Sequence, residues 1–354
     1  MTLIPEAFDM AVTFDHPEFD HHEQVLFCTD KKSGLKAIIA VHNTNLGPAI
    51  GGCRMWLYET SGEALTDALR LSRGMTYKNA LAGLPHGGGK SVIIADSHKD
   101  KTPELIEAFA HHVRCLADRY ITAEDVGITS DDADRMARIA PNVGGTSEQG
   151  LGDPSPYTAL GVYHGIKAAA QHKFGDANLK GLRISVQGLG NVGFRLATHL
   201  YEEGAILTVS DVYQPNLDKA IATFDADTCA PDQAHLVDCD IFAPCALGGG
   251  LNSKTIPEIK ATVVAGAANN QLLKAEDDEA LRHAGILYAP DYVINAGGVI
   301  AVAMTGNDEK AEAEATEKTV AIGETLLEIF DAAKAQNQPT GKIADQIAEQ
   351  RFDK

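Results

Sequence analysis

The chain has 354 residues, of which 44% are hydrophobic, and its formal net charge is −19. This length predicts two domains, each with its own core, and the excess of acidic side chains argues against nucleic acid or an anionic membrane as a partner. The six cysteines form no C-x-x-C pair, and no apolar run is long enough to span a membrane. We therefore expect reduced cysteines, no metal site and a cytoplasmic protein.

The first part of the chain alternates strand-like and helical runs. About the first 20 residues show no period and are expected to form a surface arm. The next runs, 23–28 and 35–42, predict a β-hairpin. The expected helices are 61–81, capped by Ser61, 102–118, capped by Thr102, and 130–139, capped by Ser130, with short strands expected at 92–95 and 120–122.

Three glycines and a lysine, residues 87–90, are expected to form a loop before a strand. The loop resembles a phosphate-binding loop, but Leu84 stands where the first glycine is required, so an NTPase is disfavoured. Each glycine costs backbone entropy, which suggests that another group approaches this backbone closely. Lys78, Lys90 and Asp125 could carry acid–base chemistry, because a lysine beside another cation loses its proton more easily. The alternative is that both lysines are ordinary solvated surface groups.

A stretch rich in Gly, Pro, Ser and Asn, residues 141–156, predicts a domain boundary. We place the first domain at 1–148 and the second at 149–329, with a C-terminal helix at 330–354 that could pack back on the first. After a helix at 158–172, the apolar runs predict a parallel sheet whose carboxyl ends line a ligand crevice. These runs are 240–246, 262–270 and 286–291, and a long helical tail is expected from residue 295.

The strongest single motif is G-x-G-x-x-G at Gly188, Gly190 and Gly193. It follows a strand-like run, 183–187, and opens a helical one, 192–203, which is the context of a dinucleotide-binding turn with pyrophosphate at the helix N-terminus. Asp211 ends the next strand, where a carboxylate can accept both ribose hydroxyls and would repel a 2′-phosphate. The motif therefore favours NAD over NADP, and the alternative is a plain turn.

Six motifs in one order resemble the leucine/phenylalanine/valine dehydrogenase branch of the glutamate dehydrogenase superfamily. They are GMTYK (74–78), GGGK (87–90), AEDVG (123–127), GLGNVG (188–193), AANNQL (267–272) and PDYVINAGG (290–298). The resemblance implies an α/β fold of two domains: an N-terminal α/β substrate domain, which also serves oligomerisation, and a Rossmann-type NAD-binding domain. An active-site cleft would lie between them.

The resemblance also implies the reaction, which is reversible NAD-dependent oxidative deamination of an L-amino acid to its 2-oxo acid and ammonia in a homo-oligomer. Lys78 matches the lysine that holds the substrate carboxylate, Lys90 the lysine that activates water, and Asp125 the carboxylate that exchanges protons. The other matching substrate positions are Ile50, Gly51, Met75, Gly89, Asn269 and Val293. The matching cofactor positions are Thr158, Gly188, Leu189, Gly190, Asn191, Val192, Gly193, Asp211, Cys245, Ala246, Ala267, Ala268 and Asn269.

The resemblance implies an apolar substrate side chain, because Ile50 and Val293 stand where glutamate dehydrogenases hold a γ-carboxylate. Gly89 suggests room for a ring, so an aromatic amino acid such as phenylalanine or tryptophan is favoured, with leucine, valine or isoleucine as the alternative. A catalytically silent NAD-binding regulatory protein is the rival from another class, and loss of a lysine or Asp125 would have favoured it. A hydroxy-acid dehydrogenase would need a histidine base, for which His86 is the nearby candidate.

Overall fold

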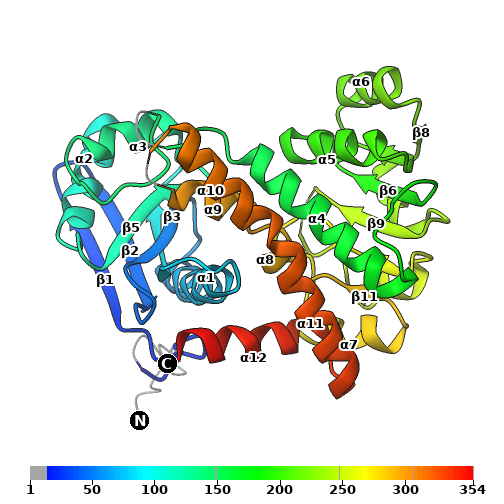
Figure 1. The fold of residues 1–354 in the computed structure, drawn as a ribbon. Helices are drawn as coiled ribbons and strands as arrows, with labels where there is room; N and C mark the ends of the chain where they lie inside the picture. Colours follow the sequence, from blue (N-terminus) through cyan, green and yellow to red (C-terminus); the bar gives the residue numbers. More distant parts are fainter. Residues whose placement is uncertain (1–13, 148–149, 247, 305, 354) are drawn as a thin grey trace, which may run out of the picture.

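Two β-sheets, each with its own helices, lie on either side of the long helices α4 (Ser155–Phe174) and α11 (Ile322–Gln336), as Figure 1 shows. The computed structural model describes residues 14–147, 150–246, 248–304 and 306–353. This is the two-domain α/β architecture that the sequence predicts, although the boundary near residue 148 stays a prediction. Within the described ranges, every helix is too short or too polar to cross a membrane.

The first sheet has the strand order β1-β2-β4-β3-β5. Its strands are β1 (Gln24–Asp30), β2 (Leu35–Asn43), β3 (Ala49–Trp56), β4 (Gly87–Ile94) and β5 (Tyr120–Glu124). The predicted hairpin is confirmed, because β1 pairs with β2 in antiparallel register. Strand β2 also pairs antiparallel with β4, whereas β4, β3 and β5 run parallel.

Helix α1 (Ser61–Leu81) covers one face of this sheet, where Leu65 and Leu69 pack with Ile38 and Val92. Helices α2 (Pro103–Arg114) and α3 (Ser130–Ala137) cover the other face, whose core includes Phe109. The sheet is therefore buried on both sides, which explains why β2 and β4 read as continuous apolar runs rather than as alternating ones.

Two of the three predicted helix caps are wrong by one residue. Thr60, not Ser61, caps α1 by accepting the N–H of Glu63, and Thr129, not Ser130, caps α3 in a capping box with Asp132. Both threonines have extended backbones, which is what a cap requires, whereas the serines after them are already helical. Thr102 caps α2 as predicted, but that helix ends at Arg114 rather than near residue 118.

The glycine run was predicted to be a loop, but it forms the start of β4. Its glycines let the strand touch neighbouring backbone: a Cβ on Gly88 would lie 2.0 Å from the N of Thr76 on α1, and one on Gly87 would lie 1.8 Å from the O of Asn43. The predicted close approach is real, and the approaching group is the protein's own backbone.

The second sheet has the order β11-β10-β9-β6-β7-β8, and all its strands run parallel. They are β6 (Arg183–Gln187), β7 (Ile206–Ser210), β8 (Asp227–Thr228), β9 (Ile241–Pro244), β10 (Val263–Val264) and β11 (Leu287–Tyr288). The helices among them are α5 (Asn191–Glu202), α6 (Gln214–Phe224) and α7 (Glu276–His283), with short 3-10 turns η1 (Pro231–Leu236) and η2 (Ile256–Glu258). The predicted Rossmann-type sheet is confirmed, although its last strands are shorter than the apolar runs.

The helical tail is broken rather than continuous. Its pieces are α8 (Asp291–Ile294), α9 (Gly297–Ala303), α10 (Glu309–Val320), α11 and α12 (Thr340–Phe352). Gly306 and Asn337 adopt positive φ angles of 107° and 52°, and Pro339 precedes α12. Asn337 ends α11 in a left-handed conformation, whereas α9 ends where the backbone becomes extended at Met304, and Pro339 stands at the N-terminus of α12.

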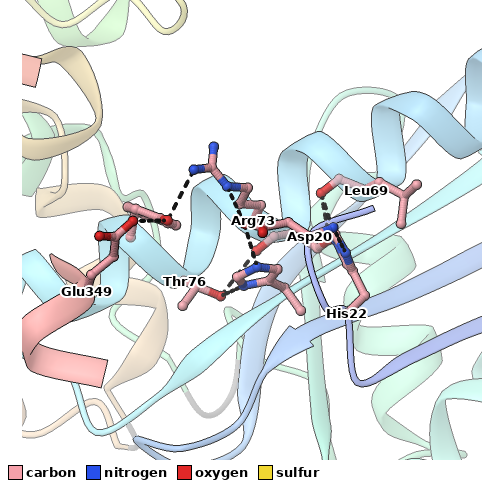
Figure 2. A network of polar contacts seen from close by, with 9 residues as sticks. Asp20, His22, Leu69, Arg73, Thr76 and Glu349 are labelled. Atoms are coloured by element: carbon pink, nitrogen blue, oxygen red, sulfur yellow. Dashed lines mark hydrogen bonds and ion pairs between the residues drawn. The ribbon is translucent and has the colours of Figure 1, made fainter. Parts of the chain in front are cut away.

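Helix α12 returns across the molecule to α1, and a polar network joins them to the N-terminal segment (Figure 2). Arg73 donates through Nε to Asp20 at 2.7 Å and through a terminal nitrogen to the hydroxyl of Tyr77 at 3.1 Å. The Tyr77 hydroxyl donates to Glu349 of α12 at 2.9 Å. Of the predicted N-terminal arm, residues 1–13 lie outside the described residues. Asp20, farther along the arm, contacts α1 through Arg73.

Candidate active site

The two expected acid–base groups lie against each other. Lys90 is on β4, and Asp125 directly follows β5, with only β3 between these two strands in the sheet. The Lys90 Nζ donates a hydrogen bond to the Asp125 Oδ2 in an ion pair, and Lys90 is only 7% exposed. A buried ammonium and carboxylate in contact can share and exchange a proton.

A second cation, Arg54 of β3, also faces this carboxylate. Its Nε lies 3.6 Å from the Asp125 Oδ2, and its terminal nitrogen donates to Asp67 of α1 at 2.9 Å. Burial opposes the charged form of Asp125, but the Lys90 ammonium and the Arg54 guanidinium together lower its pKa below the usual value. Asp125 is therefore ionised in this arrangement.

Lys78, near the end of α1, lies in a chain of amides instead. Its Nζ donates to the Oδ1 of Asn295 at 2.8 Å. The Nδ2 of Asn295 donates in turn to the Oδ1 of Asn269 at 2.8 Å and to the carbonyl oxygen of Ala267 at 3.1 Å. This chain joins a helix of the first domain to the loop that follows β10 in the second.

The electrostatics of the two lysines differ from expectation. The sequence suggested that the two lysines lie beside each other as a pair of cations, but the direct contact of Lys90 is the Asp125 carboxylate. Burial disfavours the ammonium of Lys78, and Lys90 adds repulsion, so the pKa of Lys78 is lowered to about 8. Within the described ranges, Lys78 has Asn295 as its hydrogen-bond partner and makes no direct ion pair with a carboxylate.

The residues expected to touch the substrate side chain include Ile50 and Gly51 on β3, in the first domain, and Val293 on α8, in the second. Ile50 of β3 and Val293 of α8 are each 2% exposed. Gly51 lies beside Met75 of α1, since a Cβ on Gly51 would be 3.3 Å from the Met75 Cγ. Each of these positions is apolar, and β3 and α8 both contact α1.

The expectation that Gly89 leaves room for a substrate ring is wrong. A Cβ at this position would lie 2.6 Å from the Cδ2 of Tyr120 and 3.2 Å from the Cβ of Ala49. The space is filled by the chain's own tyrosine, whose hydroxyl donates to the carbonyl oxygen of Gly51 at 2.6 Å. The missing methyl group at residue 89 therefore faces the core of the first domain.

The glycine turn after β6 fits a dinucleotide. Gly188 has φ of +94°, and a Cβ on Gly193 would lie 2.0 Å from the O of Gly188, so the turn is tight and α5 packs close to it. The position of a Cβ on Gly190 is open, and no side chain caps the first N–H groups of α5. These features suit a pyrophosphate, and they leave Leu189, Asn191 and Val192 around it.

The remaining cofactor positions gather at the carboxyl ends of the parallel strands. Cys245 and Ala246 follow β9, and Gly188 lies against Ala246. Ala267 and Ala268 follow β10. Thr158, on α4, donates to the carbonyl oxygen of Pro154 at 3.1 Å and packs against α9, where a Cβ on Gly298 would lie 2.8 Å from the Thr158 hydroxyl.

Asp211 lies at the end of β7 as expected, and it also braces the glycine turn. Its carboxylate accepts the backbone N–H of Leu189 at 2.6 Å, the backbone N–H of Tyr213 at 2.7 Å and the amide of Asn216 at 3.2 Å. Burial works against the charge, but these hydrogen bonds lower the pKa of Asp211 below its usual value. An ionised acid at this edge repels a 2′-phosphate, in keeping with NAD.

Comparison with known families accounts for both domains. Residues 22–141 match the model of the Glu/Leu/Phe/Val dehydrogenase dimerisation domain, and residues 150–220 and 213–342 match that of the Glutamate/Leucine/Phenylalanine/Valine dehydrogenases. The chain belongs to the Glu/Leu/Phe/Val dehydrogenase family. It is accordingly an NAD-dependent amino-acid dehydrogenase, an oxidoreductase acting on CH–NH2 donors.

Several members of the Glu/Leu/Phe/Val dehydrogenase family are similar over nearly their whole length. A leucine dehydrogenase of Geobacillus stearothermophilus is 51% identical over 96% of this chain and 93% of its own. A valine dehydrogenase of Streptomyces virginiae is 46% identical over 96% of both chains. The crystal structure of L-tryptophan dehydrogenase from Nostoc punctiforme has a TM-score of 0.83 at 45% identity, covering 94% of this chain and 96% of that one.

Two residues of the site were not singled out from the sequence. Arg54 follows the glycine pair of β3, and Asn295 precedes the pair at Gly297 and Gly298. Asn295 stands inside one of the motifs that carry the family resemblance and Arg54 outside all six, but a polar residue close to glycines reads equally well as part of a turn. Their contacts come from elements far away in the sequence, so only the folded chain reveals them.

Proposed function

We propose that this family member catalyses reversible oxidative deamination of a hydrophobic L-amino acid to its 2-oxo acid and ammonia. The observation that carries the proposal is the pairing of Lys90 with Asp125 beside a second lysine, Lys78, that makes no direct ion pair with any carboxylate the structure describes. The first pair can move protons, and the unpaired cation can hold the substrate carboxylate.

Lys78 binds the carboxylate in this proposal. An ammonium has three N–H donors, and the Asn295 amide takes one of them. No other acceptor among the described residues is hydrogen-bonded to this nitrogen, so two donors remain for the oxygens of a carboxylate. Such binding also relieves the burial of an uncompensated charge, since an adjacent anion favours the ammonium form.

Lys90 and Asp125 manage the protons. Asp125 takes a proton from the substrate amine or from water, and Lys90 assists the attack of water on the iminium carbon and stabilises the developing oxygen charge. Arg54 keeps Asp125 ionised before the reaction begins. NAD, when bound at the glycine turn, supplies the acceptor for the hydride from the substrate Cα.

The side chain of the substrate is proposed to be branched and aliphatic, such as that of leucine or valine. Ile50 and Val293 offer buried, β-branched surfaces without a polar partner for a substrate carboxylate or hydroxyl. The aromatic preference expected from Gly89 loses its support, because Tyr120 occupies that space. One methylene changes the discrimination between substrates by only about 1–3 kcal/mol. The first assay therefore compares aromatic with branched-chain substrates.

We also propose that the enzyme is a cytoplasmic homo-oligomer assembled through its first domain, residues 1–148, with 149–329 as the NAD-binding domain. Strand β1 lies at the edge of its sheet, and Phe27 on it is 59% exposed. An edge strand with an exposed aromatic side chain is suited to pairing with a second copy.

The test is NAD reduction with a panel of L-amino acids, namely leucine, valine, isoleucine, phenylalanine, tryptophan and glutamate, ranked by kcat/KM. We expect the branched-chain substrates first and glutamate last. Preference for aromatic substrates would overturn the side-chain proposal, and no reduction with any of the six would favour a catalytically silent NAD-binding protein.

Lys90→Ala tests the assigned chemistry. Turnover should fall by about 10²–10⁴-fold, the usual contribution of general acid–base catalysis, while NADH binding is retained. Lys99→Ala is the matched control, because this lysine of the same domain is 80% exposed and pairs with Asp96 at the surface. If Lys90→Ala keeps more than about a tenth of the wild-type rate, the role assigned to Lys90 is wrong.

A further inference from the structure

The chain of amides beside Lys78 has a fixed polarity. Lysine is only a donor, so the Asn295 oxygen must face Lys78. A backbone carbonyl is only an acceptor, so the Asn295 nitrogen must face Ala267. These two independent constraints agree, and they settle the orientation of the Asn295 amide, which is 5% exposed.

This orientation dictates that of the next amide. The Asn295 Nδ2 donates to Asn269, so the oxygen of Asn269 is held inward at 2.8 Å. The Nδ2 of Asn269 then points away from Asn295 as a donor, and Asn269 itself is exposed. The side chain of Asn269 consequently presents its N–H groups, rather than its carbonyl oxygen, on the side away from Asn295.

We propose that Asn295 is a positioning residue that fixes the donor face of the Asn269 amide and the place of the Lys78 ammonium in one polar chain between the two domains. In this proposal it acts through these two neighbours, to which its amide is hydrogen-bonded. A donor at Asn269 suits the oxygen of a 2-oxo acid or of the nicotinamide carboxamide. The assignment rests on the proposed function, since it concerns the same reaction.

The position of Asn295 explains why an amide, rather than an acid, stands there. Lys78 is faced by Asp291 of α8, by Lys90 of β4 and by Asp125 after β5. A carboxylate at residue 295 would pair with Lys78 directly and compete with the substrate carboxylate. It would also have no N–H for Ala267 or Asn269, so the Asn269 amide would lose the contact that orients it.

The experiment measures inhibition by the deaminated analogue of the preferred substrate, for example 4-methylpentanoate for leucine, in the presence of NADH across the pH range. This probe has no amine, so its binding follows Lys78. In wild-type enzyme the inhibition constant should rise above about pH 8, where burial places the pKa of Lys78. We call this rise of the inhibition constant with pH the alkaline limb. Asn295→Asp should move the limb to higher pH by about one pH unit or more, because a new carboxylate stabilises the ammonium.

Asn295→Ala should move the limb in the opposite direction, because it removes the acceptor from Lys78. Both variants should lower kcat by about tenfold or more, since each frees the Asn269 amide to rotate. Gln271→Ala is the matched control: Gln271 braces the same loop by donating to Gly266 at 2.8 Å and Ala268 at 3.0 Å, without contacting Lys78. It should leave the pH limb in place even if it lowers activity.

The proposal is overturned if the limb stays within about 0.3 pH unit of wild type in both Asn295 variants, or shifts equally in Gln271→Ala. NADH fluorescence reports whether each variant is folded. Should Asn295→Asp fail to fold, the comparison of Asn295→Ala with Gln271→Ala decides. Failure of the proposed function looks different, because wild-type enzyme would then reduce NAD with no amino acid of the panel.

Discussion

Gly88 of β4 packs against Thr76 of α1, and these two elements also carry Lys90 and Lys78. Gly88→Ala therefore tests whether the close packing of α1 on β4 sets the geometry of the site. The added Cβ would lie 2.0 Å from the backbone N of Thr76 and 2.5 Å from its Cα. Ordinary van der Waals contact begins near 3.4 Å, so α1 and β4 must separate by about 1.4 Å. Backbone atoms cannot rotate aside as a side chain can, so the whole helix or strand must move.

The cost follows from this displacement. Overpacking of a well-packed core costs about 1–3 kcal/mol and more when backbone must shift, so we expect a loss of at least about 2 kcal/mol in the free energy of unfolding. Activity should fall further than stability suggests. Lys90 lies two residues after Gly88 and Lys78 two residues after Thr76, and a misplacement of about 1 Å between reacting groups costs about 10²-fold in rate.

The assay is urea unfolding followed by circular dichroism, together with kcat/KM for the preferred amino acid. Gly74→Ala is the control, since Gly74 lies in the same helix with open space at its Cβ position. That variant should gain about 0.5–1 kcal/mol, because alanine has less backbone entropy to lose in a helix. If Gly88→Ala matches wild type in both measurements, the close contact of α1 with β4 is not what requires glycine.

Two further predictions concern the pocket. Gly89→Ala should destabilise the protein by about 1–3 kcal/mol through its contact with the Tyr120 ring and should leave the ranking of the amino-acid panel unchanged, whereas a selective loss of aromatic substrates would restore the view that residue 89 faces the substrate. Carboxylate inhibitors should weaken by up to about tenfold per pH unit above the pKa of Lys78, about 8, because the ammonium is present below that pH and lost above it. An inhibition constant that stays flat to pH 10 would remove Lys78 as the carboxylate ligand.

The dinucleotide-binding half was the most predictable part of the chain. Strand, glycines, helix and terminal acid lie within 30 consecutive residues, 182–211, so local sequence carries the whole unit. The structure keeps each of these elements at its expected place. It adds that Asp211 braces the backbone N–H of Leu189, a contact that no pattern of spacing encodes.

The first domain was predicted less well, and the reason is physical. A run of glycines reads as a loop because glycine disfavours strands in isolation, but Gly87 and Gly88 are in β4 because neighbouring backbone leaves no space for a Cβ. Gly89 was expected in the substrate pocket for another reason, the family resemblance, but Tyr120 fills the space at its Cβ position. Tertiary contact with Asn43, Thr76 and Tyr120 decides these positions, and such contact is invisible in the local sequence.

The two lysines show why the sequence predicts which residues form the site but not which partner each charged group has. Their spacing suggested one pair of cations in which either could lose its proton. In the folded chain each lysine has a different kind of partner: a carboxylate for Lys90 and a neutral amide for Lys78. A paired cation has its field largely cancelled, whereas an ammonium held by an amide keeps its full charge for an incoming anion. The partner of each lysine therefore sets its role: Lys90, paired with Asp125, is suited to catalysis, and Lys78, beside Asn295, is suited to binding.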